Sequence, residues 1–130
     1  MEQDPTETPR GELQIRQLAM PGDTNPAGDI FGGWVMAQMD AAGGIAASAV
    51  ARGRVVTVAA SSMVFIQPVK VGDVVCVYTD LTRIGRTSVT FDIAAWVLRR
   101  GNGQRIKVTQ AEFTFVAVDE GGRPRPVPRD

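Results

Sequence analysis

The stretch that decides the fold reads Gly32-Gly-Trp-Val-Met-Ala-Gln-Met-Asp40-Ala-Ala-Gly-Gly-Ile-Ala-Ala-Ser-Ala-Val-Ala51, followed by Arg52-Gly53. Apolar residues recur in it at helical spacing, which predicts a helix that begins after Gly32-Gly33 and ends near Arg52-Gly53. Polar side chains are so few that this helix is expected to be buried on most of its sides.

One strand is predicted before the helix and four after it, from alternating or β-branched apolar residues; they span residues 13–18, 54–65, 73–83, 87–99 and 105–118. The connectors at 67–72, 84–86 and 101–103 are short, so the last four strands are expected to pair as an antiparallel meander. One helix beside one curved antiparallel sheet is an α+β domain in which the sheet wraps the helix.

Residues 13–120 are predicted to form this single domain. Residues 1–12 are acidic and rich in Pro and Thr, and are predicted to be a disordered tail. Residues 121–130 form a tail rich in Pro and Arg, which cannot continue a strand ladder because proline lacks the N–H group. Neither a signal peptide nor a membrane-spanning run is recognised, so a cytoplasmic protein without a membrane partner is expected.

The amino-acid composition excludes several kinds of catalytic and metal-binding site. The chain has no histidine and one cysteine, Cys76, which excludes a histidine-based triad, an internal disulfide and histidine or cysteine metal sites. No metal or organic cofactor is expected. The formal net charge of +0 argues against nucleic acid as a partner. The region from Arg83 to Asp130 nevertheless holds nine Lys/Arg and five Asp/Glu, which suits a phosphorylated small molecule, with a solvated charged surface as the equal alternative.

Gly32 and Gly33 stand where the helix begins. Glycines permit a tight backbone entry and leave the first amides open to a ligand. Those amides have no acceptor inside the helix, and the helix dipole adds positive potential, so they are suited to a carbonyl oxygen that gains negative charge. A turn with close packing is the competing explanation of the two glycines.

Asp40 is the only ionisable residue from Phe31 to Ala51, which favours a general base that activates water over a carboxylate at an exposed helix edge. It follows Gly33 by seven residues, on nearly the same face but about 10.5 Å along the axis. A general base must lie within about 3 Å of its water, so Asp40 cannot serve a carbonyl at its own chain's Gly33. If both residues are catalytic, the active site must lie between two antiparallel copies of the helix.

The run from Leu18 to Asp40 resembles the hallmark of hotdog-fold acyl-CoA thioesterases of the YciA type. Further matches are Gly53-Arg-Val-Val-Thr-Val58, Val71-Gly-Asp-Val-Val-Cys76, Gly85-Arg-Thr-Ser88 and Phe115-Val-Ala-Val-Asp119. The resemblance covers about residues 13–128. It implies a βαββββ hotdog fold whose minimal unit is a homodimer with its sheets joined edge to edge, often assembled into hexamers as trimers of dimers. It also implies hydrolysis of acyl-CoA to a free acid and CoA, without a cofactor.

The resemblance assigns roles residue by residue. Asp40 is the base or the nucleophile, and the amide of Gly33, with Gly32 beside it, polarises the thioester carbonyl. Asn25 and Asp29 are the polar loop positions that face the site. Turn formation is the favoured role of Asn25, and capping of the helix start is an alternative role for Asp29. For CoA the resemblance indicates Arg54 and the turn from Arg83 to Ser88, in which Arg86, Thr87 and Ser88 meet phosphate or pantetheine. Ser61 is a candidate for the thioester.

Two alternatives accompany this hypothesis. The first is a non-catalytic module on the same fold that binds acyl-CoA or an acyl carrier, with Asp40 structural. The second, a hotdog dehydratase, is disfavoured because its usual histidine base is absent. The acyl chain is expected to meet a pocket of Trp34, Met36, Met39, Met63 and Phe65, with plain core packing as the more common role of such residues.

Overall fold

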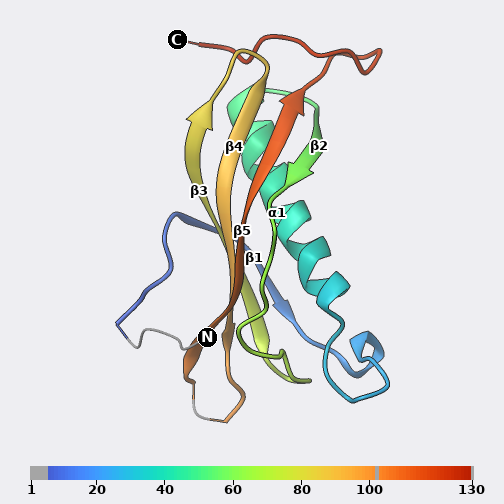
Figure 1. Cartoon of the computed structure of the whole chain (residues 1–130), viewed down its shortest axis with the longest axis vertical. Helices are drawn as coiled ribbons and strands as arrows, with labels where there is room; N and C mark the ends of the chain where they lie inside the picture. The colour runs from blue at the N-terminus through green and yellow to red at the C-terminus, as the bar shows by residue number, and fades with distance from the viewer. Residues whose placement is uncertain (1–5, 102, 130) are drawn as a thin grey trace.

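The computed structural model describes residues 6–101 and 103–129. Its elements follow the predicted order: β1 (Glu12–Leu18), a 3-10 turn η1 (Pro21–Asp23), α1 (Gly32–Ala51), β2 (Val55–Ala60), β3 (Val74–Ile84), β4 (Ser88–Leu98) and β5 (Arg105–Ala117). The five strands form one antiparallel sheet with the order β1-β3-β4-β5-β2, and α1 lies across one face of it (Figure 1). The predicted α+β class with one sheet around one helix is confirmed.

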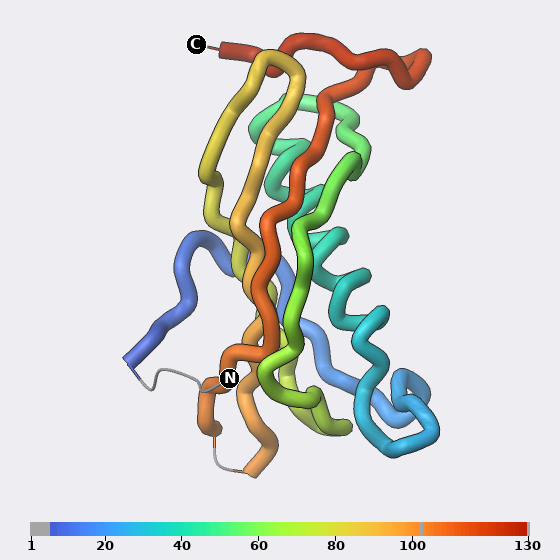
Figure 2. Tube along the Cα trace, viewed as in Figure 1, coloured from blue at the N-terminus to red at the C-terminus, as the bar shows by residue number. Residues whose placement is uncertain are grey.

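The predicted meander is correct only for β3, β4 and β5. Strand β2 pairs with β5 instead of β3, and β1 pairs with β3 (Figure 2). The chain leaves β2 after Ala60 and continues beside β5, where the Ile66 amide donates to the Val108 carbonyl at 2.7 Å. The segment expected to be a hairpin connector is therefore part of a longer crossing from the edge strand β2 to β3, which lies beside the opposite edge strand β1. The strand predicted to reach residue 65 ends at Ala60.

The helix packs closely on the sheet through small residues. A Cβ atom on Gly43 would lie 2.5 Å from the ring of Phe115 and 2.6 Å from Ile93, so only glycine permits this approach. The residues of α1 that are buried against the sheet are Val35, Met39, Ala42, Gly43, Ala46, Ala47 and Ala51. The helix ends at Ala51, and the C-cap residue, Arg52, adopts the left-handed conformation with φ 55°.

The prediction that α1 is buried on most sides is wrong for the single chain. Its outward face is open, with Met36 43% and Ile45 51% exposed and with Ala37 and Ala41 also exposed. One sheet covers only one side of a helix, so the remaining apolar surface needs another partner. The neighbouring edge strand β2 is similarly exposed at Val56 and Val58.

Both tails contact the domain. In the described part of the N-terminal segment, residues 6–11, Glu7 forms an ion pair with Lys107 at 2.7 Å; residues 1–5 of the predicted tail lie outside the described residues. The C-terminal segment turns back at residues 119–123 and crosses the end of the sheet, where Val127 is buried (Figure 2). No helix in the described ranges has the length and apolar character needed to cross a membrane.

Candidate active site

Asp40 lies in the middle of α1, on the outward face, and its side chain is exposed in the single chain. The hydroxyl of Thr57, on β2, donates a hydrogen bond of 2.6 Å to its Oδ1 atom. The other carboxylate oxygen, Oδ2, has no hydrogen-bond partner among the described residues. The carboxylate is therefore fixed at one oxygen and open at the other, next to the free edge of the sheet.

Gly33 is the second residue of α1 and is exposed, and a Cβ atom built on it would meet nothing within 4 Å. Within residues 6–101 and 103–129, its N–H group has no hydrogen-bond acceptor. The N-cap residue, Phe31, supplies no side-chain acceptor either. An open amide at the positive end of a 20-residue helix is suited to bind an oxygen that carries negative charge.

The polar loop before α1 is organised by its own side chains. Asn25 Oδ1 accepts hydrogen bonds from the amides of Ala27 at 2.9 Å and Asp29 at 3.1 Å, which is the turn-forming arrangement expected for this residue. Asp29 forms an ion pair with Lys70 and does not cap the helix, because the N-cap position is two residues later at Phe31. Both side chains thus hold the loop that sets the start of α1.

The single chain does not bring Gly33 and Asp40 together. Both belong to α1, where seven residues correspond to two turns and about 10.5 Å along the axis. Both are exposed on the outward face, together with Ala37 and Ala41, whose small side chains leave room for a close neighbour. The two groups can meet at one substrate only if a second chain lies against this face.

An apolar pocket of about 330 Å³ adjoins the helix start. Phe65 covers Gly32 there, because a Cβ atom on Gly32 would lie 3.4 Å from its ring. Of the predicted acyl pocket only Phe65 lines this space, since Met39 is fully buried in the core, Trp34 and Met63 pack on the core, and Met36 is exposed elsewhere on α1. The pocket residues are Ile30, Gly32, Val35, Phe65, Ile66, Gln67, Pro68 and Val69.

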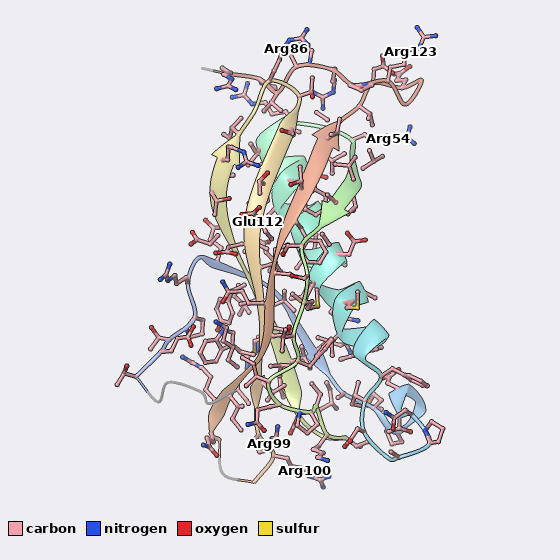
Figure 3. All side chains as sticks on the ribbon, in the orientation of Figure 1. Arg54, Arg86, Arg99, Arg100, Glu112 and Arg123 are labelled. Carbon is pink, nitrogen blue, oxygen red and sulfur yellow. The ribbon has the colours of Figure 1, made fainter. Side chains whose placement is uncertain are left out.

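The residues predicted to bind CoA lie at the other end of the molecule. Arg54 and Arg86 gather with Arg123 at the end of the sheet away from the start of α1, and Arg99 and Arg100 lie at the opposite end (Figure 3). Arg54 precedes β2, Arg86 and Thr87 lie in the turn between β3 and β4, and Ser88 is the first residue of β4. The guanidinium of Arg83 donates to Thr90 Oγ1 at 3.3 Å.

Ser61 stands apart from this group. Its hydroxyl accepts a hydrogen bond of 2.8 Å from the amide of Glu112, and its own amide donates to the Glu112 carbonyl. The Ser61 side chain therefore joins the segment after β2 to β5.

Two residues that contact the site elements were missed by sequence reasoning. The sequence marks Thr57 only as a β-branched strand residue, and its hydrogen bond to Asp40 spans 17 positions, so no local pattern identifies it. Arg125 donates to the last carbonyl of α1, that of Ala51, at 3.0 Å, although the proline-rich segment around it suggested only the end of the sheet. A basic residue in such a tail is a candidate for a helix C-terminus, where the dipole favours a cation.

The thioesterase superfamily profile matches residues 27–104 of the chain. The acyl-CoA thioester hydrolase YciA of Salmonella typhimurium is 54% identical over 124 residues, which are 93% of this chain and 93% of the relative. A hexameric thioesterase from Yersinia pestis is 53% identical with a TM-score of 0.90, over 95% of this chain and 100% of that chain. A hexameric hotdog-fold thioesterase of Campylobacter jejuni is 40% identical with a TM-score of 0.86, over 91% of each chain. The chain therefore has the hotdog fold and belongs to the thioesterase superfamily, among the acyl-CoA thioester hydrolases of the YciA type.

Proposed function

We propose that this protein hydrolyses acyl-CoA thioesters to a carboxylic acid and CoA, at sites formed between two copies of the chain. The observation that carries the proposal is the pair of open groups on the outward face of α1: the Gly33 amide without an acceptor and the Asp40 carboxylate with one free oxygen. The name of the Salmonella relative supplies the thioester class.

The proposed reaction uses one group from each chain. The Gly33 N–H of one chain binds the thioester carbonyl oxygen, and the helix dipole stabilises the negative charge that forms there. Asp40 of the second chain removes a proton from water through Oδ2, and the water oxygen attacks the carbonyl carbon. The tetrahedral intermediate then breaks its C–S bond, and the CoA sulfur leaves with the proton. Thr57 holds Oδ1, so that Oδ2 keeps its direction.

The subunit arrangement follows from the exposed surfaces. Val56 and Val58 are exposed on the edge strand β2, and Met36 and Ile45 are exposed on the outward face of the neighbouring helix α1. An antiparallel second copy placed there extends the sheet across β2 and brings each Asp40 toward the other chain's Gly33. We propose this homodimer as the minimal unit and a hexamer as the assembly, since the Yersinia and Campylobacter thioesterases are hexameric.

The remaining proposed contacts divide between the two ends of the molecule. Arg54 and the turn from Arg83 to Ser88 are proposed to bind the phosphates and pantetheine of CoA, because arginine pairs with two phosphate oxygens at once. Asn25 and Asp29 are proposed to position the start of α1. Cys76 is a buried, free thiol, which suits the reducing cytoplasm as the proposed location.

The test is CoA release from a panel of acyl-CoAs by Asp40→Asn and Asp40→Ala, with Glu112→Gln as the control for loss of an exposed carboxylate. Loss of the general base is expected to lower kcat about 100-fold or more, while the control keeps wild-type turnover. Turnover near wild type in both Asp40 variants would refute the catalytic role. A wild-type protein that binds acyl-CoA without hydrolysing it would identify the non-catalytic binding module instead.

A further inference from the structure

The C-terminal arm, residues 119–129, crosses the end of the sheet at which the proposed CoA residues lie (Figure 2). Its backbone is tied down at two points, since the Arg125 amide donates to the Ala117 carbonyl and the Val127 amide to the Arg86 carbonyl, both at 2.9 Å. Val127 is only 3% exposed. The arm is therefore a packed part of the domain, with a direct backbone bond to the turn that carries Arg86.

The Arg125 side chain joins the two segments that flank Arg54. Its Nη2 atom donates to the carbonyl of Ala51, the last residue of α1, and its Nε atom donates to the carbonyl of Val118, each at 3.0 Å. The Val118 amide in turn donates to the Arg54 carbonyl at 3.0 Å. One guanidinium thus holds the helix end and the strand end between which the backbone of Arg54 is fixed.

Gly53 is a second point of contact between the turn that carries Arg54 and the C-terminal arm. A Cβ atom at this position would lie 2.7 Å from Arg125 Nη2, so a larger residue before Arg54 would displace the guanidinium from this position. The turn from Arg52 to Arg54 and the arm are therefore fitted to each other. Their shared surface is a groove of about 570 Å³ lined by Arg52, Gly53, Arg54, Val118, Asp119, Glu120 and Arg125.

Arg129 makes the equivalent contact with the other proposed CoA element. Its Nη2 atom donates to the carbonyl of Gly85 at 2.7 Å and to that of Ile84 at 3.3 Å, at the end of β3. These two carbonyls directly precede Arg86 in the turn. The arm therefore fixes the backbone on one side of Arg86 through a side chain and at Arg86 itself through Val127.

The charge at this end suits a polyanion. Residues 52–54, 83–88 and 119–129 together hold seven arginines but only two acidic residues, Asp119 and Glu120. One of these acids is engaged locally, because Asp119 Oδ1 accepts the amides of Gly121 and Arg123 at 2.9 Å each. The excess of arginine attracts phosphate groups, and Arg54 and Arg86 are exposed to meet them.

We propose that Arg125 and Arg129 are positioning residues, which fix Arg54 and Arg86 in the orientation that binds the phosphates of the CoA nucleotide. This inference rests on the proposed thioesterase function. It assigns to the C-terminal arm the affinity for the nucleotide half of the substrate, separately from the chemistry at Gly33 and Asp40. Because the arm acts only through the arginines, its contribution requires a substrate that carries those phosphates.

The experiment compares two substrates with the same acyl group, acyl-CoA and the acyl thioester of N-acetylcysteamine, which lacks the nucleotide. Arg125→Ala is expected to raise KM for acyl-CoA about tenfold, as for loss of a charge-assisted phosphate contact, with kcat unchanged. Kinetics with the short thioester should equal those of the wild type. Arg125→Lys should give a smaller increase, because an ammonium does not reproduce the guanidinium fork. Arg100→Ala is the control for loss of an exposed arginine, since Arg100 lies at the opposite end of the sheet and its side chain has no hydrogen bond or ion pair among the described residues.

A double-mutant cycle with Arg54→Ala distinguishes an effect of Arg125 on the orientation of Arg54 from a general loss of structure. If Arg125 acts through Arg54, the double variant should have the KM of Arg54→Ala alone, which is full non-additivity. Equal losses with both substrates, or additive effects in the cycle, would overturn the inference. The inference would also be overturned if the wild type hydrolyses acyl-CoA and the Arg54→Ala and Arg125→Ala variants have the wild-type KM. That result would leave the proposed function intact. Absence of hydrolysis by the wild type would instead reject the proposed function.

Discussion

Thr57 and Asp40 join the edge strand to the middle of the helix through a hydrogen bond of 2.6 Å between Oγ1 and Oδ1. The two residues are 17 positions apart, and the bond is formed because β2 lies beside α1 after the chain turns back at Arg52. It fixes one oxygen of the proposed base and leaves the other toward the open face. The same bond ties the carboxylate to the strand on which the second chain is proposed to pair.

Thr57→Val removes this bond without changing the shape of the side chain much. The loss of one hydrogen bond to a carboxylate is expected to lower kcat about tenfold, since such bonds contribute roughly 1.5–3 kcal/mol. Thr57→Ser keeps the hydroxyl and should retain most of the activity. Steady-state kinetics on one acyl-CoA measure the effect, and equal turnover in the valine and serine variants would show that the bond has no role.

Val58→Lys tests the proposed pairing of two chains through β2. Val58 is 54% exposed in the single chain, and a lysine on an edge strand opposes pairing with another strand. The variant is expected to shift to the monomer in analytical ultracentrifugation and to lose activity in parallel. Leu18→Lys is the control at the other sheet edge, where Leu18 is 47% exposed on β1. A dimeric and active Val58→Lys protein would place the interface elsewhere.

The elements of this fold can be predicted from local pattern, but their partners cannot. Apolar runs and alternation predicted β3, β4 and β5 to within one residue of each end. The pairing of β2 with β5 depends on contacts between distant residues, such as Val55 and Ala117, that no local pattern contains. The turn residues at Gln67–Gly72 looked like a hairpin connector because the same residue types serve in longer crossings.

In the candidate site, too, local features can be predicted from the sequence and long-range contacts cannot. Asp40 and Gly33 are candidates in the sequence because a lone acid and a glycine pair at a helix start are unusual, and their catalytic roles stay predictions. The exposure of the helix was not predicted, since apolar residues on its outward face have the same sequence signature whether its own sheet or a second chain covers them. Arg125 was missed because its bond to Ala51 spans 74 residues.

Gly43→Ala should destabilise the fold, because its Cβ atom would lie 2.5 Å from the Phe115 ring and the helix cannot shift without losing its other contacts. Overpacking of this kind costs about 1–3 kcal/mol. Gly44→Ala is the matched control in the same helix, with nothing within 4 Å of the added atom and a gain in helix propensity. Thermal unfolding is expected to show a lower midpoint for Gly43→Ala only. Equal midpoints for the two variants would contradict the described packing of α1 on the sheet.

The buried thiol of Cys76 should respond to pH at the alkaline end. Burial raises the pKa of this thiol, more than the nearby guanidinium groups of Arg16 and Arg105 lower it. The neutral thiol is therefore favoured in the folded chain, and its contribution to stability is present below the ordinary thiol pKa and lost as the pH rises through the raised value. Alkylation by iodoacetamide should be slower in the folded than in the unfolded chain and should accelerate at higher pH. A reaction as fast as that of the unfolded chain would show that Cys76 is accessible.

The central claim, that each site takes Asp40 from one chain and Gly33 from another, is tested most directly by mixing two inactive variants. Asp40→Asn removes the base, and Gly33→Pro removes the amide hydrogen in the first helical turn, where proline is tolerated. In a dimer with one chain of each kind, one site loses both groups and the other keeps both. Chains produced together in equal amounts should therefore regain about a quarter of wild-type activity per chain, because half of the dimers are mixed and each has one intact site. Activity that stays at the level of the separate variants, in chains shown to have formed mixed dimers, would contradict a shared site.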